Sequence, residues 1–195
     1  GDATDARIPA LDKSLRCVNY ADKVDTKDIP APGLYPPQVI DEANEDIDIF
    51  IEFLKKQNIK VLRPEKNKPD YYNYCPRDVL FTYGDKIIFA PMSIRARQNE
   101  YLAYTKLLPE SLQTTMKITR EDSLYNESCI DNKKVFALNE TEPCFDAANV
   151  LRHNQDVFYL VSNSGNLSGA NSLQNFLGTE TKVHVIENVY SYMHL

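Results

Sequence analysis

The strongest constraint on the fold is a strand–strand–helix–strand order that the sequence predicts twice. In the first instance, residues 79–83 and 86–90 are β-rich runs separated by a Gly-Asp dipeptide, which is a hairpin signal. Residues 95–108 then place apolar and aromatic side chains on one helical face, and residues 114–118 are expected to return as a strand. This order is typical of a compact α/β unit.

The second instance occupies the C-terminal part of the sequence. The expected elements are strands at 135–138, 149–152, 156–161 and 182–186 and a helix at 167–177. A Ser-Asn-Ser-Gly loop precedes that helix and Gly178 is expected to cap it. The two instances lie roughly 80 residues apart, and although no residue-level repeat is visible, this rhythm indicates a pseudo-symmetric α/β architecture.

The N-terminal region is expected to be less regular. Residues 1–37 contain five of the eleven prolines, and we expect them to form mostly extended loop. Residues 38–56 have apolar side chains at helical spacing, with acidic residues early and lysines late, which predicts a helix whose acidic stripe is solvated. Residues 58–64 are expected to form a short strand that ends at Pro64.

Charge and composition exclude several classes of function. Lys and Arg total 22 against 28 Asp and Glu, a formal charge of −6, so nucleic acid is not an expected partner. No apolar run approaches the roughly 20 residues that cross a bilayer, so we expect no membrane segment. No signal peptide is visible, which favours a cytoplasmic protein, and the first residue is not Met, so we expect the native start to lie upstream.

The four cysteines are scattered without a CxxC pair, and the three histidines fit no zinc spacing. We therefore expect reduced thiols, no metal site and no cofactor. Three other residues stand out by context, because Asp78 and Asp146 follow proline-containing turns and His194 follows a strand by a short aromatic loop. Taken singly, each of these has a plain structural explanation as a turn-former, a helix cap or a surface histidine.

Three motifs occur in order along residues 70–195. The first is Pro-Arg-Asp at 76–78, continued by the segment 87–104 with its Ala-Pro-Met and Arg-Ala-Arg runs. The second is Glu-Pro-Cys-Phe-Asp-Ala-Ala at 142–148, and the third is Val-His-Val-Ile at 183–186 leading to Met-His. In order and spacing these motifs resemble the family of glycine and inosamine-phosphate amidinotransferases, and residues 38–64 fit its upstream part more loosely.

The resemblance implies a fold and a missing part. It implies a five-fold pseudo-symmetric α/β propeller of ββαβ modules, the pentein fold, of which residues 1–195 would form about half of a single incomplete domain. It places the nucleophilic cysteine of the family in a glycine-rich segment further along the chain. Because a half-propeller exposes strand edges, we expect completion by further sequence or by another chain, and a homodimer is among the expected assemblies.

The resemblance also assigns roles to four residues. His194 matches the catalytic histidine and Asp146 the aspartate that completes the Cys-His-Asp set. Asp78 matches a substrate-contacting aspartate and Met193 the residue that lines the pocket beside the histidine. Cys144 matches a position that is not the nucleophile, and an adjacent acid would raise the pKa of a thiol. The implied partners are arginine as amidino donor and a small amine as acceptor.

The chemistry of such a site follows from its groups. Aspartates can bind the planar guanidinium of arginine in bidentate fashion and leave its central carbon open to a thiolate. The histidine would protonate the departing ornithine amine and then deprotonate the incoming amine, with a covalent amidino-cysteine in between. Two alternatives stay open: a deiminase-type guanidine hydrolase that uses water, and a noncatalytic relative that binds an arginine-like ligand or a partner.

Overall fold

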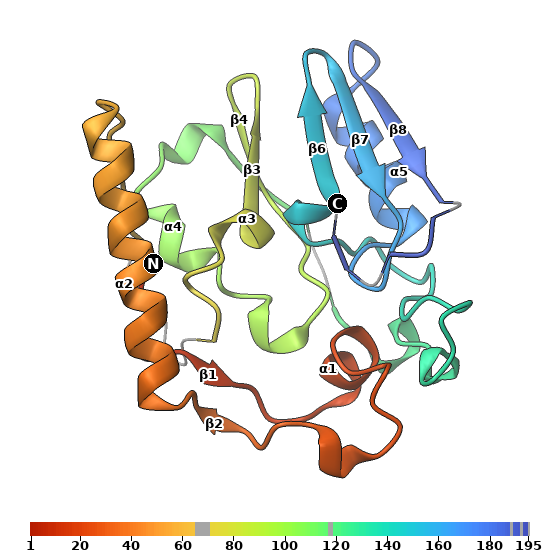
Figure 1. Cartoon of the computed structure of the whole chain (residues 1–195). Coiled ribbons are helices and arrows are strands. Elements are labelled where there is room, and N and C mark those ends of the chain that lie inside the picture. Colours follow the sequence, from red (N-terminus) through yellow and green to blue (C-terminus); the bar gives the residue numbers. More distant parts are fainter. Residues whose placement is uncertain (65–70, 117–118, 188, 192, 195) are drawn as a thin grey trace.

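The computed structural model describes residues 1–64, 71–116, 119–187, 189–191 and 193–194. Two three-stranded sheets lie next to each other, a long helix borders the first sheet, and the N-terminal segment passes across one end of both (Figure 1). Helices and sheets alternate along the chain, so the expected α/β class is confirmed. In the described part of the chain, no helix is both long and apolar enough to cross a membrane.

The first module follows the predicted order closely. The hairpin pairs β3 with β4 in antiparallel register, and β5 then joins β4 in parallel. Its elements are α3 (Pro76–Val79), β3 (Leu80–Tyr83), β4 (Lys86–Phe89), η2 (Arg95–Arg97), α4 (Leu102–Thr105), η3 (Glu110–Leu112) and β5 (Gln113–Thr115). The crossover is thus three short helical turns and not the continuous helix expected over 95–108, and residues 117–118 of the expected strand lie outside the described residues.

The second module repeats the same topology with a complete crossover helix. β6 pairs with β7 in antiparallel register and β8 joins β7 in parallel. Its elements are η6 (Ala147–Asn149), β6 (Val150–His153), β7 (Asp156–Leu160), α5 (Leu167–Leu177) and β8 (Lys182–Ile186). Helix α5 and strand β8 have the predicted bounds, and Gly178 ends the helix with a φ of 80°, a conformation that glycine adopts without steric cost.

The two hairpins show that the modules are structurally equivalent. Each has a two-residue turn whose first residue has a positive φ, Gly84 at 57° and Asn154 at 53°. Their first strands start at Leu80 and Val150, which are 70 residues apart, fewer than the 80 expected from the sequence. The repeated order of strands and helix is confirmed, but its period is shorter than expected.

The N-terminal region is more structured than expected. Within the predicted loop, β1 (Arg7–Ile8) pairs with β2 (Gly33–Leu34), while α1 (Lys13–Val18) and η1 (Thr26–Asp28) lie between them. Asp12 caps α1 by accepting a hydrogen bond from the Leu15 amide. The expectation of extended loop was wrong here because a helix of 6 residues is too short to show a periodic pattern.

Two expected strands are absent from the described residues. Residues 58–64 have no ladder partner, and 135–138 form only an isolated bridge between Tyr125 and Leu138. A β-prone run becomes a strand only when a neighbouring strand takes up its backbone hydrogen bonds, and no local pattern supplies that neighbour.

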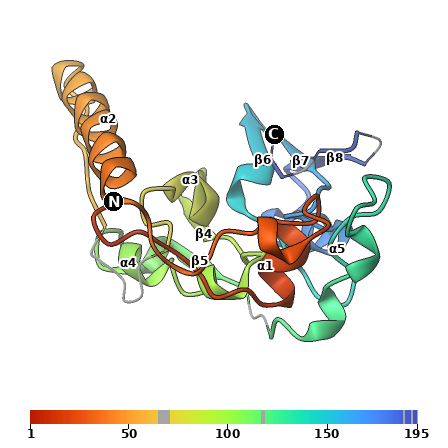
Figure 2. The same cartoon turned by 60° about the horizontal axis from the view of Figure 1, so that its bottom comes forward.

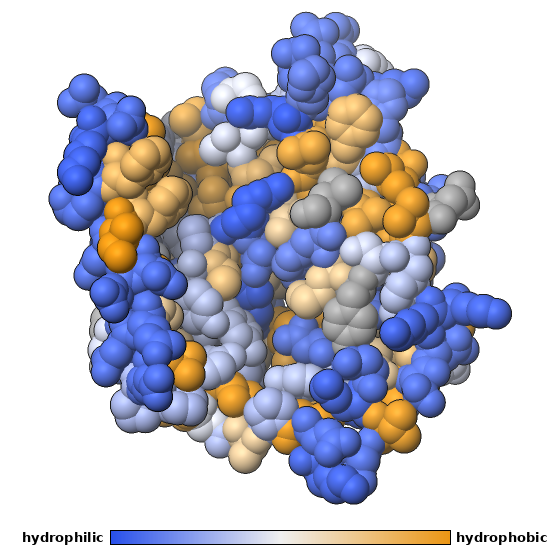
Figure 3. Space-filling model, viewed as in Figure 1, coloured by the Kyte–Doolittle hydropathy of each residue, from blue (hydrophilic) through white to orange (hydrophobic). Residues whose placement is uncertain are grey.

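Helix α2 (Pro37–Lys56) confirms the strongest helix prediction, but it contains no buried residue. Figure 2 shows it projecting beside the first module, on the side away from the second sheet. Its acidic stripe is exposed as expected, and an apolar patch over the helix is exposed as well (Figure 3), with Phe50 59% and Phe53 56% exposed.

The main core lies between the two modules. Ile88 and Met92 from the first module pack with Phe145, Val157 and other residues of the second. A second cluster joins α1 to η4 (Asp122–Leu124) and η5 (Glu127–Cys129) below the sheets. Burial of these apolar side chains fixes how the loops that precede β3 and β6 face each other.

Candidate active site

Asp146 lies directly before η6, and its side chain is fully buried. The backbone amide and the hydroxyl of Ser93 both donate to its Oδ1 atom, each at 3.1 Å. Its own backbone amide donates to the Ser164 carbonyl at 3.0 Å. A buried carboxylate needs such donors, and here Ser93 of the first module supplies both of them, while Ser164 of the second module holds the backbone of Asp146. The sequence analysis did not single out Ser93, because its partner is 53 residues away.

His194 completes a pair with this carboxylate. Its Nε2 atom lies 3.2 Å from Oδ2 of Asp146, and its Nδ1 atom lies 3.8 Å from Oδ1 of Asp78. Burial by itself lowers the pKa of His194, but the hydrogen bond to Asp146 and the charges of Asp146 and Asp78 outweigh it, so the pKa is raised above its ordinary value. The imidazolium form is therefore stabilised in the folded protein.

Asp78 lies in α3 and is held by a buried cation. Its Oδ2 atom accepts from Nη1 of Arg97 at 2.9 Å. Arg97 also contacts Glu100 through Nε at 3.0 Å and Nη2 at 2.9 Å, and its guanidinium lies over the Tyr72 ring at 4.8 Å. Burial lowers the pKa of Arg97, yet the charges of Glu100, Asp146 and Asp78 more than offset this and raise it.

Arg97 and Glu100 received no individual role in the sequence analysis. Their spacing of three residues inside a helical pattern is a signal for an ion pair. Their burial, with Arg97 3% and Glu100 4% exposed, was not foreseeable from that pattern, because surface pairs of this spacing are far more common.

Arg77 joins the two parts of the site. Its guanidinium donates to the Ala147 carbonyl at 2.5 Å and to the Val150 carbonyl. These carbonyls belong to the turn and strand that follow Asp146, whereas Asp78 is the next residue after Arg77. A single side chain therefore fixes the separation between the two aspartates.

Met193 is placed through its backbone. Its carbonyl accepts from Asn149 Nδ2 at 3.3 Å and from the Ser164 hydroxyl at 3.1 Å, and both donors are buried. The segment that carries His194 is thus attached to the same loops as Asp146. Met193 itself is half-buried, and its expected role in lining a substrate pocket stays a prediction.

The charged groups of the site compensate one another. Asp78, Asp146 and Glu100 bring three carboxylates, and Arg77, Arg97 and the imidazolium of His194 bring three positive charges. A cationic guest would pair with a carboxylate oxygen that these cations leave open.

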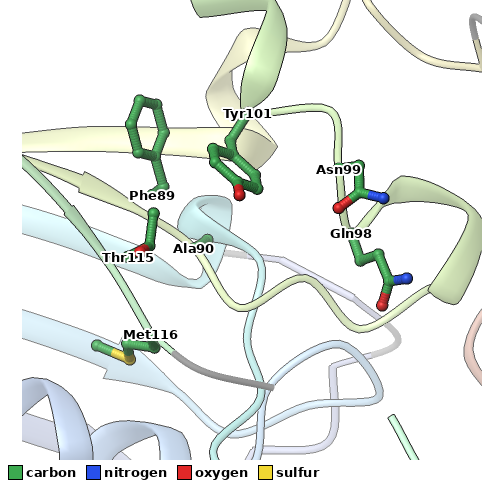
Figure 4. Close-up of a pocket in the computed structure, with 7 residues that line it drawn as sticks. All are labelled: Phe89, Ala90, Gln98, Asn99, Tyr101, Thr115 and Met116. Carbon is green, nitrogen blue, oxygen red and sulfur yellow. The ribbon is translucent and has the colours of Figure 1, made fainter. Parts of the chain in front are cut away.

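A separate cavity of about 460 Å³ lies at the ends of β4 and β5 (Figure 4). Phe89, Tyr101 and Thr115 line it together with the amide side chains of Gln98 and Asn99. Asp146 and His194 do not contribute to its wall. We assign the candidate active site to the Asp78–His194–Asp146 group, because there a histidine meets a fully buried carboxylate and a second carboxylate.

None of the four cysteines, all of which lie in the described chain, has the properties of an activated nucleophile next to His194. All four are free. Burial, with a smaller contribution from the charge of Asp146, raises the pKa of Cys144 to about 12, which disfavours the thiolate form that a nucleophile needs. Burial and the charge of Asp78 raise the pKa of Cys75 to about 11. The described residues contain no cluster of three potential metal ligands among His, Cys, Asp and Glu.

Comparison with known proteins gives consistent results for sequence and structure. The chain is 37% identical over its whole length to inosamine-phosphate amidinotransferase 1 of Streptomyces glaucescens and covers 60% of that protein. Glycine amidinotransferase of Xenopus tropicalis is 33% identical over 78% of the chain, which covers 43% of that protein.

The structure superposes on the solved inosamine-phosphate amidinotransferase of Streptomyces griseus with a TM-score of 0.88 and 36% identity, over 100% of this chain and 60% of that one. No family model matches the sequence. The chain therefore spans about 60% of the length of the curated relatives that it matches along its whole length.

Proposed function

Because this chain belongs to the amidinotransferase family, we propose that it supplies the acid–base pair and part of the donor site of an enzyme that moves the amidino group of arginine to an amine. The observation that carries the proposal is the contact of 3.2 Å between His194 and the buried Asp146, beside a second aspartate. The same two modules would form part of a five-module propeller.

In this proposal Asp78 contacts the donor, while Asp146 holds His194. The guanidinium of arginine is a planar cation with five donors, and a carboxylate oxygen that has no other partner can accept from it. Arg97 already occupies Oδ2 of Asp78 and leaves Oδ1, which faces His194, for the substrate. Met193 would contact the substrate beside the histidine.

The chemical step needs a thiolate, which we assign to a cysteine outside residues 1–195. The thiolate adds to the guanidinium carbon and forms the C–S bond, and the C–N bond to ornithine then breaks. His194, charged because of Asp146, gives its proton to the departing amine. The neutral imidazole next takes a proton from the acceptor amine, which attacks the amidino carbon and releases the thiolate.

The identity of the acceptor is not determined by these residues. The relatives named above differ in acceptor by their names, one being an inosamine phosphate and the other glycine. We therefore propose only a small amine. The chemistry uses no cofactor or metal. Four free cysteines favour a reducing compartment, and we propose a cytoplasmic protein.

The test uses the longer protein that contains these residues, incubated with arginine labelled in the amidino carbon. We expect label to become bound to a cysteine and ornithine to be released in equal amount before any amine is added. Transfer of the label to an added amine supports the transferase, whereas its release by water alone supports the hydrolase. Bound arginine without either reaction would support the noncatalytic alternative and contradict our proposal.

A further inference from the structure

Two buried cysteines from distant parts of the sequence meet below the sheets. Cys17 lies in α1 and Cys129 ends η5, and their side chains are 0% and 2% exposed. The thiol of Cys129 donates to the Cys17 carbonyl oxygen at 3.7 Å, and both side chains belong to the same buried cluster.

The fold holds these two segments against each other independently of the thiols. The Asp131 amide donates to the Ala21 carbonyl at 2.7 Å, and Lys13 and Glu127 form an ion pair at 3.5 Å. Both contacts join the region of α1 to the region of η5. The closeness of the two cysteines is therefore set by the surrounding structure, which gives one thiol a high effective concentration near the other.

Cys129 also borders a cavity. This cavity, of about 260 Å³, is lined by Cys129, Tyr190 and charged side chains of both signs, Asp22, Asp131 and Lys133. Its volume is sufficient for the reacting end of a small disulfide. Cys17, in contrast, does not line this cavity.

We propose that Cys17 and Cys129 form a redox-active dithiol that a small-molecule disulfide entering this cavity oxidises to an intramolecular disulfide. The thiolate of Cys129 attacks one sulfur of the small disulfide, which forms a mixed disulfide and releases one thiolate. Cys17 then loses its proton and attacks the sulfur of Cys129, which releases the second thiolate. The protein loses two protons and two electrons, and the small disulfide is reduced to two thiols.

The electrostatics agree with this order of events. The hydrogen bond from Cys17 lowers the pKa of Cys129, against the effect of burial, and the same contact raises the pKa of Cys17. Cys129 is thus the better attacking group and Cys17 the resolving group. The proposal concerns these thiols alone and does not depend on the proposed transfer activity.

The experiment treats the longer folded protein that contains these residues with oxidised glutathione and maps its peptides by mass spectrometry. Within residues 1–195 we expect one cross-linked peptide pair that contains Cys17 and Cys129, lighter by two hydrogen masses than the two reduced peptides and reversed by dithiothreitol. Cys17→Ser should instead retain one glutathione on Cys129. Cys129→Ser should slow modification of Cys17 on the order of tenfold or more, because the thiol that borders the cavity is gone. Cys144→Ser, in which another buried thiol is removed, should behave like the parent.

Two further outcomes test the proposed dithiol. The same treatment in concentrated urea should give no preference for the Cys17–Cys129 link, because the folded contact is lost. Folded protein that yields a link to Cys75 or Cys144, or that remains fully reduced while Cys17→Ser also stays unmodified, would overturn the proposal. The far-UV circular dichroism of each variant shows that it is folded.

Discussion

The Nε2 atom of His194 lies 3.2 Å from Oδ2 of Asp146, a carboxylate with no exposed surface whose other oxygen accepts two hydrogen bonds from Ser93. Both oxygens of Asp146 are therefore engaged, and the imidazole meets a carboxylate that cannot rotate away. This rigidity makes the charge state of His194 a measurable property of the fold.

The first prediction concerns the titration of His194. Because the hydrogen bond and charge of Asp146 raise its pKa, Asp146→Asn should lower that pKa toward or below the ordinary value near 6.5. The imidazole signals in NMR spectra recorded across pH measure it. Asp156→Asn is the matched control, since Asp156 pairs with His184 at 2.7 Å and should leave His194 unchanged. An unaltered His194 titration in Asp146→Asn would contradict the assigned cause.

A related prediction concerns stability as a function of pH. A histidine whose pKa is raised in the folded state stabilises the protein fully below the unfolded value near 6.5, and this contribution is lost as the pH rises through the folded pKa. Urea denaturation at a series of pH values should show that decline in the parent. The decline in stability with rising pH should be smaller in His194→Gln, because glutamine does not titrate at this position. An equal decline in the parent and the variant would refute the linkage.

The third prediction concerns the buried cation of the site. Arg97→Met leaves the carboxylates of Asp78 and Glu100 without their partner, and we expect a loss of about 3–5 kcal/mol in the free energy of unfolding. Arg63→Met removes an exposed pair with Asp48 and should cost only about 0–1 kcal/mol. Urea denaturation of both variants measures the difference. Equal losses in the free energy of unfolding would mean that the buried ion pair contributes no more to stability than the surface ion pair.

The fourth prediction concerns the support of the Asp146 loop. Asn166 caps α5 by accepting from the Gly169 amide at 2.9 Å, and the same oxygen accepts from Cys144 at 3.0 Å. Its side-chain nitrogen donates to the Asn139 and Glu142 carbonyls. Asn166→Ala should therefore destabilise the protein by about 2–3 kcal/mol, more than an ordinary cap. Asn171→Ala, on the exposed face of the same helix, should cost less than about 0.5 kcal/mol, and chemical denaturation compares them.

The last prediction depends on the proposed function and uses the longer protein. His194→Ala should lower kcat for ornithine release by about 10²–10⁴-fold, because the proton donor is lost. Asp78→Asn should mainly weaken arginine binding, seen by calorimetry, because it removes a carboxylate that faces the substrate. His184→Ala is the control for the removal of an imidazole. A normal rate in His194→Ala would exclude this histidine as the acid.

Local sequence patterns determined much of the second module. The bounds of α5 and β8, the two hairpins and the Gly178 cap follow from periodicity and turn chemistry, which act between residues a few positions apart. The motif residues Asp78, Asp146 and His194 were also named from the sequence, and the structure brings them together.

The tertiary structure decided what local patterns cannot encode. The bonds from Ser93 to Asp146 and the contact of Cys129 with Cys17 join residues that are far apart in the sequence. The burial of Arg97 with Glu100 likewise depends on the segments that pack around them. Residues 58–64 are a further example, because their composition favours a strand but no neighbouring strand pairs with them. Secondary structure reflects short-range propensity, whereas hydrogen-bond partners and desolvation are properties of the packed chain, and the site is built from the latter.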